Sequence, residues 1–178
     1  LKTFGVTVEE TETGWKVPGG QSFAGPRMRF TEGDWSNAAF WLTAGAIKGS
    51  VGCQGLDMES AQGDREIVSI LENFGAERKM ILHQITATNK EMKGIRIDAS
   101  QIPDLVPVLS VVAACGQGAE FTDIRRLRLK ESDRVESVLA MIRALGGYAE
   151  ATENTLTVHG TGLTGGTVDC ANDHRIAM

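Results

Sequence analysis

Two short strings of the sequence combine acidic and basic side chains where helices are expected to begin. R-L-K-E-S-D-R spans residues 128–134, and N-D-H-R spans residues 172–175. Histidine exchanges protons near neutral pH, carboxylates act as acids or bases, and arginine and lysine hold anions. Taken alone, each string is also compatible with a solvated, charged helix entry or with a capping Asp beside surface charges.

Two further motifs call for different interpretations. Asp104 follows Ile102-Pro103 just before an apolar segment, where a lone Asp is most often only an N-cap. The glycines of residues 160–165 fit the G-x-G-x-x-G pattern of dinucleotide-binding sites, but that pattern must open a helix. Because residues 166–169 are predicted to form a strand, these glycines are expected in a turn.

The elements that must position these motifs repeat along the chain. Gly75 and Gly146 end similar amphipathic segments, 65–74 and 133–145, at an offset of 146 − 75 = 71 residues. Short strands follow each segment, and then comes a loop that opens an apolar helix. A further strand is predicted over 120–124, just before the second segment. These apolar helices are predicted at 38–47, at 105–114 and from Arg175 onward, and residues 27–30 resemble 94–97 as part of a clipped first copy. The repeating unit is therefore β-α-β-α-β-β, which predicts an α/β (α+β) fold.

The repeat aligns three loops that open helices: residues 32–37, 100–104 and 171–174. Each helix N-terminus carries roughly half a positive charge and unpaired N–H donors. If the units pack around a pseudo-threefold axis, these N-termini converge and form an anion site that includes Asp104 and the pair His174–Arg175. A structural repeat without a shared site is the alternative.

Composition favours a small anion over a polymeric partner. The 178 residues carry a net charge of −5, although five cations crowd into residues 125–134. That balance argues against nucleic acid, and the absence of an apolar run near 20 residues argues against a membrane span. The three cysteines have unrelated spacings, which indicates neither disulfides nor zinc and favours a reducing, cytoplasmic location. The chain begins at Leu1 and stops at Met178 near a helix start, so we expect an internal fragment of a longer protein.

Together these strings resemble the enolpyruvyl transferases, and within them the EPSP synthase branch, over essentially the whole chain. The Gly33–Asp34 loop, the turn at 62–64 and the string at 19–22 also look like that family. The resemblance implies two lobes, each an inside-out α/β barrel of three repeats. Residues 1–30 would close the far lobe, and residues 31–178 would supply two repeats and the start of a third in the near lobe.

The resemblance also implies a reaction, the transfer of the enolpyruvyl group of phosphoenolpyruvate to the 5-hydroxyl of shikimate-3-phosphate with release of phosphate. Asp104 matches the family's base for that hydroxyl, and Lys130 matches the residue that contacts it and passes its proton. Glu131 matches the acid for the methylene carbon, with His174 beside it.

The anion-binding roles follow from the same match. Arg134 and Arg175 match the fork-shaped partners of phosphoenolpyruvate, and Asp104 and Lys130 also contact substrate. Arg126 stands where some members have an Asn and is left without a role. No metal or organic cofactor is implied, and the expected partners are the two anionic substrates. The chain alone is expected to be inactive and to self-associate through apolar surface that an incomplete third repeat exposes. A non-catalytic lobe that binds a small anion or assembles with a partner is the alternative.

Overall fold

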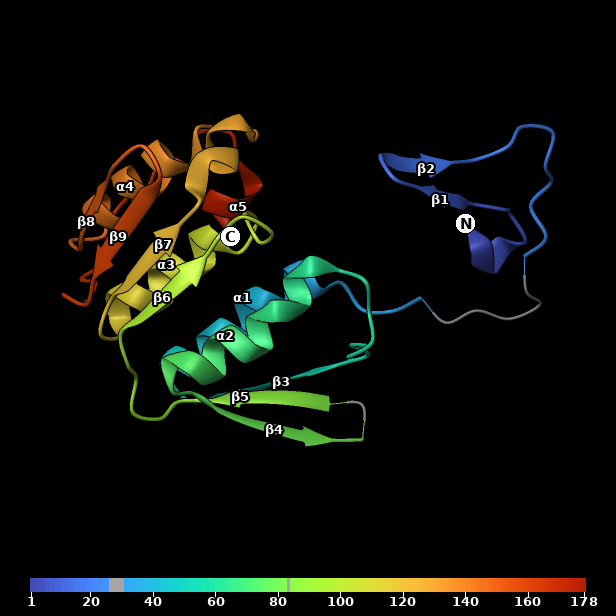
Figure 1. The fold of residues 1–178 in the computed structure, drawn as a ribbon. Coiled ribbons are helices and arrows are strands. Elements are labelled where there is room, and N and C mark those ends of the chain that lie inside the picture. Colours follow the sequence, from blue (N-terminus) through green and yellow to red (C-terminus); the bar gives the residue numbers. More distant parts are fainter. Residues whose placement is uncertain (26–30, 83) are drawn as a thin grey trace. The chain divides into compact units, whose positions relative to one another are not determined.

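The computed structural model describes residues 1–25, 31–82 and 84–178, which form two compact units, Leu1–Thr31 and Glu32–Met178 (Figure 1). The first unit contains the short 3-10 helix η1 (Lys2–Phe4) and an antiparallel hairpin of β1 (Glu9–Thr11) and β2 (Gly14–Lys16). The expected boundary near residue 30 falls outside the described residues. The assignment of the first unit to a separate lobe therefore stays a prediction.

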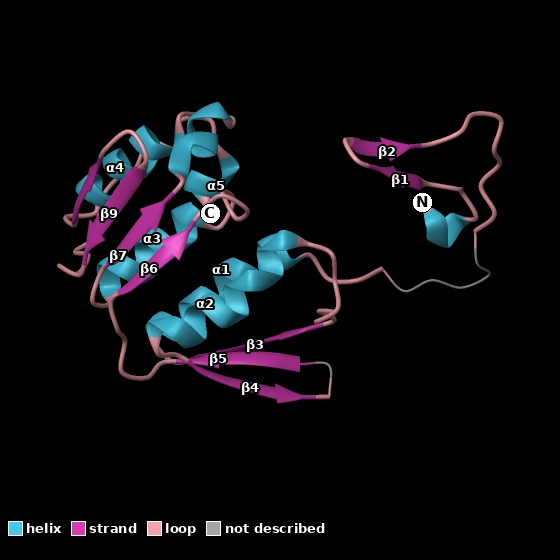
Figure 2. Ribbon diagram, viewed as in Figure 1, coloured by secondary structure: helices cyan, strands magenta, loops and turns pink. Residues whose placement is uncertain are grey.

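The second unit alternates helices and strands along its whole length (Figure 2). None of the helices in the described ranges is long and apolar enough to cross a bilayer. The elements of the second unit are α1 (Trp35–Ile47), β3 (Ser50–Gln54), η2 (Gly63–Glu66), α2 (Ile67–Phe74), β4 (Glu77–Ile81), β5 (Gln84–Thr88), β6 (Ile95–Asp98), α3 (Val106–Cys115), β7 (Ala119–Thr122), η3 (Ile124–Leu129), α4 (Arg134–Ala144), β8 (Tyr148–Ala151), β9 (Thr155–His159) and α5 (His174–Ala177).

The strands confirm the predicted α/β repeat. β5 begins at residue 84 and β9 at residue 155, an offset of 155 − 84 = 71, and each pairs antiparallel with the strand before it. The sheet orders are β3-β5-β4 and β6-β7-β9-β8, with β6 parallel to β7. Within the described part of the second unit both sheets are open, and they do not close into a barrel. The copy predicted at residues 27–30 lies outside the described residues.

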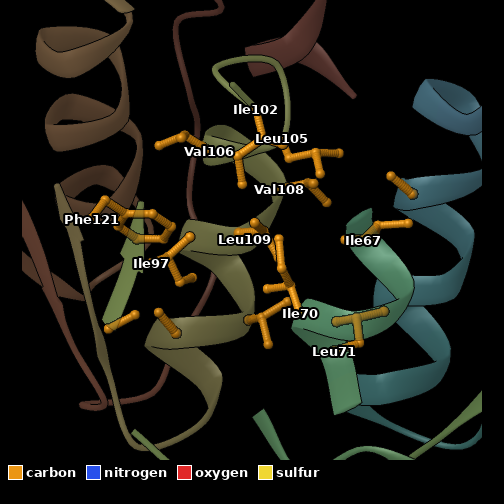
Figure 3. Close-up of a cluster of buried hydrophobic side chains, with 14 of the residues drawn as sticks. Ile67, Ile70, Leu71, Ile97, Ile102, Leu105, Val106, Val108, Leu109 and Phe121 are labelled. Carbon is orange, nitrogen blue, oxygen red and sulfur yellow. The ribbon is translucent and has the colours of Figure 1, made fainter. Parts of the chain in front are cut away.

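The helices pack against one face of each sheet and against one another. α1 and α2 cover the three-stranded sheet, α3 and α4 cover the four-stranded sheet, and α1 contacts α3 (Figure 1). Ile67 and Ile70 of α2 face Leu109 of α3, whose other side faces Ile97 of β6 and Phe121 of β7 (Figure 3). All five side chains are buried, and each contributes roughly 1.5–3 kcal/mol by burial. This core fixes the helix N-termini on which the charged motifs lie.

The helix starts differ from the predicted ones for local reasons. α1 begins at Trp35 rather than Ala38, because the Asp34 carboxylate accepts hydrogen bonds from the N–H groups of Ser36 and Asn37. The second amphipathic segment is helical from Arg134, as predicted, with Asp133 as its side-chain cap. Its counterpart opens with the 3-10 turn η2 and becomes α-helical only at Ile67, where no side chain caps it.

Two predicted strands are corrected. The strand expected over 120–124 is β7, which ends at Thr122, because Asp123 adopts a left-handed conformation (φ 55°) and leads into η3. Residues 166–169 form no strand. Their counterpart β6 pairs with β7, whereas the preceding residues Thr164 and Gly165 bond to the Leu145 carbonyl at the end of α4. The expected turn around residues 160–165 is confirmed, since no helix follows it directly.

Gly75 and Gly49 offer a matched test of the packing at the helix ends. They have nearly the same left-handed φ, 104° and 105°, but a Cβ at Gly75 would overlap the Glu91 carbonyl oxygen whereas one at Gly49 meets open space. Gly49→Ala should cost about 1–2 kcal/mol of unfolding free energy for the backbone conformation. Gly75→Ala should cost a further 1–3 kcal/mol, roughly, because the overlap displaces backbone. Equal losses in urea denaturation would contradict the close approach of Glu91.

Candidate active site

A buried guanidinium at the start of α4 organises the charged motifs. The Asp133 carboxylate accepts hydrogen bonds from the N–H groups of Val135 and Glu136, which fixes the first turn of α4. The first residue of that turn is Arg134, whose side chain is only 1% exposed. Arginine cannot lose its charge under ordinary conditions, so its burial requires carboxylate partners.

Three carboxylates share the Arg134 guanidinium along two edges. The Nε–Nη2 edge faces Asp173: Nε donates to Oδ2 at 2.7 Å and Nη2 donates to Oδ1 at 3.3 Å. The Nη1–Nη2 edge faces Asp104, at 2.6 Å from Nη1, and Glu131, at 2.6 Å from Nη2. The Asp173 side chain is fully buried, while those of Asp104 and Glu131 are 34% and 50% exposed. We therefore call the Asp173 side the inner edge and the other the outer edge.

Asp104 links Arg134 to Lys130. The Lys130 Nζ lies 2.9 Å from the Asp104 oxygen that also accepts the Arg134 bond. Burial alone would raise the pKa of the Asp104 carboxyl, but hydrogen bonds and charge from Lys130 and Arg134 outweigh it and lower that pKa. Asp104 is therefore ionised at neutral pH, with a lysine ammonium in direct contact.

Asp173 joins α5 to α4. Besides the two Arg134 donors, its carboxylate accepts the backbone N–H of Arg175 at 2.9 Å and the hydroxyl of Ser132 at 3.0 Å. Burial acts to raise the pKa of Asp173, and the hydrogen bonds from Arg134 and the Arg175 N–H outweigh it and hold the pKa below its usual range. All four contacts suit an ionised carboxylate that is removed from water.

Glu131 lies between a cation and an imidazole. Its Oε2 accepts from Arg134 at 2.6 Å, and its Oε1 lies 4.0 Å from the Nδ1 of His174. Both side chains are at least half exposed, so a ligand has access to them. A carboxyl group beside a histidine, both open to solvent, can deliver and take back a proton.

The structure brings five of the six predicted site residues into one network; the sixth contributes only its backbone. The Arg175 side chain makes no bond to the cluster, and its Nε has no hydrogen-bond partner among the described residues. Arg126, left without a role by the sequence, donates to the Ser100 carbonyl at 2.8 Å. The network consists of Asp104, Lys130, Glu131, Arg134 and His174, with Asp173 added.

The three helix-start loops share this network only in part. Residues 100–104 and 171–174 meet at Arg134 through Asp104 and Asp173. The loop at 32–37 bonds elsewhere: the Ser36 hydroxyl donates to Asp64 at 2.5 Å, and the Gln62 side chain bonds to the backbone of Gly33 and Trp35. The described residues contain no group of three or more His, Cys, Asp and Glu side chains arranged for a metal ion.

A protein-family model described as EPSP synthase (3-phosphoshikimate 1-carboxyvinyltransferase) matches residues 1–178 of this chain. The chain belongs to the EPSP synthase family. The 3-phosphoshikimate 1-carboxyvinyltransferase of Clostridium acetobutylicum is 40% identical over 181 residues, which cover the whole chain and 42% of that protein. The enzyme of the same name from Pyrococcus abyssi is 38% identical over 178 residues, the whole chain and 43% of that protein.

Solved structures of the EPSP synthase family share the fold. The EPSP synthase of Acinetobacter baumannii superposes with a TM-score of 0.81 at 26% identity, over 99% of this chain and 44% of that one. The chain thus spans about two-fifths of the length of the relatives it matches. Its charged network lies within the matched region.

Sequence reasoning assigned no site role to Asp173, a member of the network, or to Ser132, which donates a hydrogen bond to Asp173. Asp173 stands in the N-D-H-R string, for which a capping Asp is the alternative interpretation, and Ser132 stands in the R-L-K-E-S-D-R string without a site role of its own. Asp173 does cap α5, but its carboxylate is also fully buried and shared with Arg134. The available signal was the density of charge in both strings, since charges packed that closely need partners outside their own segment.

Arg134→Met tests the buried network by stability. The substitution leaves Asp104, Glu131 and Asp173 without their common cation, so unfolding free energy at pH 7 should fall by about 3–5 kcal/mol. The control is Arg96→Met, which removes an exposed pair with Glu120 at 3.3 Å and should cost under about 1 kcal/mol.

The pH dependence of that difference identifies its cause. The folded-state pKa values of Asp104 and Asp173 are lowered, so their contribution is complete above the unfolded value of about 4 and is lost as pH falls through the folded values. The difference in unfolding free energy between wild type and Arg134→Met should therefore become smaller as the pH falls to about 3. A gap that stays constant with pH would point to lost packing instead.

Proposed function

We propose that this chain supplies one side of a site that moves the enolpyruvyl group of phosphoenolpyruvate to the 5-hydroxyl of shikimate-3-phosphate, with release of phosphate. The observation that carries the proposal is the convergence of Asp104, Lys130 and Glu131 on the Arg134 guanidinium. Its relatives bear the name of that transferase, and this chain retains acids, a base and cations in direct contact. The proposed substrates are small anions. The three cysteines are free, which is compatible with the reducing, cytoplasmic location that we propose.

Asp104 and Lys130 are assigned to the hydroxyl. A base must accept the hydroxyl proton as its oxygen attacks, and the lowered pKa of Asp104 keeps that carboxylate ionised. The Lys130 ammonium, 2.9 Å away, hydrogen-bonds the same oxygen of Asp104 and offers further donors to a hydroxyl placed beside it. The pair can therefore hold the hydroxyl and receive its proton.

Glu131 and His174 are assigned to the methylene carbon. That carbon must gain a proton when the attacking oxygen bonds to its neighbour, and it must lose one again because the product retains the enolpyruvyl double bond. The group responsible has to act in both directions. Glu131, half exposed and 4.0 Å from the His174 Nδ1, has a proton-exchanging neighbour for this purpose.

Arg134 and Arg175 are assigned to the phosphoenolpyruvate anion. The outer edge of Arg134 is occupied by Asp104 and Glu131, so an anion that binds there takes the place of at least one of these carboxylates. Such exchange releases the catalytic carboxylates from their ion pairs as substrate arrives. Arg175 adds a second cation on α5 whose Nε makes no hydrogen bond within the described residues. No metal or organic cofactor enters this proposal.

Asp104→Asn tests the proposed base in a full-length enzyme that carries this sequence. The amide keeps the shape and loses the basic oxygen, so kcat should fall about 100- to 10,000-fold with little change in the KM for phosphoenolpyruvate. The control is Asp98→Asn, the same substitution at an exposed carboxylate on β6 that accepts the Ser100 backbone N–H and lies outside the Arg134 network. A near-normal kcat for Asp104→Asn would remove this residue from the mechanism.

The chain by itself should not turn over. It spans about two-fifths of its relatives' length, and an open site leaves its charges hydrated and its ligands poorly oriented. Phosphate release from phosphoenolpyruvate with shikimate-3-phosphate present is measured for the purified chain, and again after the remaining segments of a full-length relative are added. Turnover only in the mixture is expected. Turnover by the chain alone would contradict the need for a second lobe. If the chain binds the anion but neither the chain nor the mixture turns over, a non-catalytic lobe is favoured.

A further inference from the structure

The inner edge of Arg134 is held by a short chain of hydrogen bonds. The Ser137 hydroxyl donates to the Ser132 hydroxyl at 3.0 Å, and Ser132 donates to the Asp173 Oδ2 at 3.0 Å. The same Oδ2 accepts the Arg134 Nε–H at 2.7 Å. Within the described residues, Ser132 is the one side chain besides Arg134 that donates to Asp173.

An Asp side chain needs more than one partner to hold a fixed orientation. Its terminal torsion has a broad, roughly two-fold energy profile, so a single strong contact leaves the carboxylate plane free to turn. Arg134 Nη2 and the Arg175 N–H meet Oδ1, whereas Oδ2 receives only Arg134 Nε and Ser132. Ser132 is therefore the contact that ties Oδ2 to a group other than the guanidinium it must orient.

We propose that Ser132 is a positioning residue: its hydroxyl holds the Asp173 carboxylate in the plane that aims the outer edge of Arg134 at the anionic substrate. This inference rests on the proposed function for the identity of the substrate, phosphoenolpyruvate. Bidentate recognition of a carboxylate or phosphate depends on the direction of the planar fork as well as on its charge. A small rotation at Asp173 is carried directly to that fork, because the two groups are joined by two hydrogen bonds.

A merely structural role for Ser132 makes a different prediction from a positioning role. The matched control is Ser110, a fully buried serine on α3 whose hydroxyl donates to the Val106 carbonyl at 2.7 Å. Ser110→Ala and Ser132→Ala each remove one serine hydroxyl and one hydrogen bond. Both variants should therefore lose stability. Only Ser132→Ala should also change anion binding, because of the two serines only Ser132 is connected to Arg134, through Asp173.

The kinetic test uses a full-length enzyme carrying this sequence. Ser132→Ala should raise the KM for phosphoenolpyruvate about 10-fold, because the Arg134 fork is then no longer held in the direction that bidentate anion recognition requires. The kcat should stay within about threefold, because Arg134 grips the anion alike in ground and transition state. Ser132→Thr keeps the hydroxyl and should restore the wild-type KM, and Ser110→Ala should leave it unchanged.

Two outcomes would overturn the inference. One is an unchanged KM for phosphoenolpyruvate in Ser132→Ala; the other is an equal rise in Ser110→Ala. If the wild-type enzyme forms no product, the proposed function fails by itself, and the positioning claim is then decided on this chain by NMR. The Arg134 Nε–H signal, assigned by its loss in Arg134→Lys, should shift and exchange faster with water in Ser132→Ala but not in Ser132→Thr. An Arg134 Nε–H signal with unchanged position and exchange rate in Ser132→Ala would contradict the inference.

Discussion

The burial of one permanently charged side chain, Arg134, governs the arrangement of the candidate site. A guanidinium that is 1% exposed is tolerable only if carboxylates replace its lost hydration, and three of them do. Each comes from a different segment: Asp104 precedes α3, Glu131 precedes α4 and Asp173 precedes α5. Their ion pairs with one cation therefore fix the positions of the three loops relative to one another, and the groups proposed for catalysis lie on those loops.

The internal repeat explains why the loops are available for this purpose. Asp34, Asp104 and Asp173 stand at nearly constant offsets, 104 − 34 = 70 and 173 − 104 = 69, each just before a helix. Asp34 and Asp173 accept hydrogen bonds from the first N–H groups of their helices, whereas α3 begins at Val106 without a side-chain cap. The Asp104 carboxylate thus does not cap α3, and it pairs with Lys130 and Arg134 instead. One copy of a structural position has become available for chemistry.

The two edges of Arg134 differ in burial, which suits one edge to structure and the other to the anion binding that we propose. Asp173 on the inner edge is fully buried and fully hydrogen-bonded, which makes that ion pair costly to break. Asp104 and Glu131 on the outer edge are partly exposed, so an incoming anion can exchange with them at lower cost. The same cation can therefore anchor α5 to α4 and still recognise a ligand.

Much of the fold was determined by the sequence alone, because its signals are local. Apolar spacing and the glycines at 75 and 146 located α2 and α4, and the 71-residue offset of the sequence recurs between the starts of β5 and β9. The two charged strings and Asp104 also supplied the candidate residues that the structure brings together around Arg134. What the sequence left open was the partner of each charge, including the double role of Asp173, which caps α5 and also holds Arg134.

Only the tertiary structure decided those partners. Asp104 and Asp173 lie 30 and 39 residues from Arg134, and no local pattern states which carboxylate a given guanidinium will meet. Packing of α1, α2 and α3 between the sheets brings two of the three predicted helix starts to Arg134 and leaves the loop at 32–37 bonded to Gln62 and Asp64. Ion-pair choice depends on burial and distance, and both exist only once the core has formed.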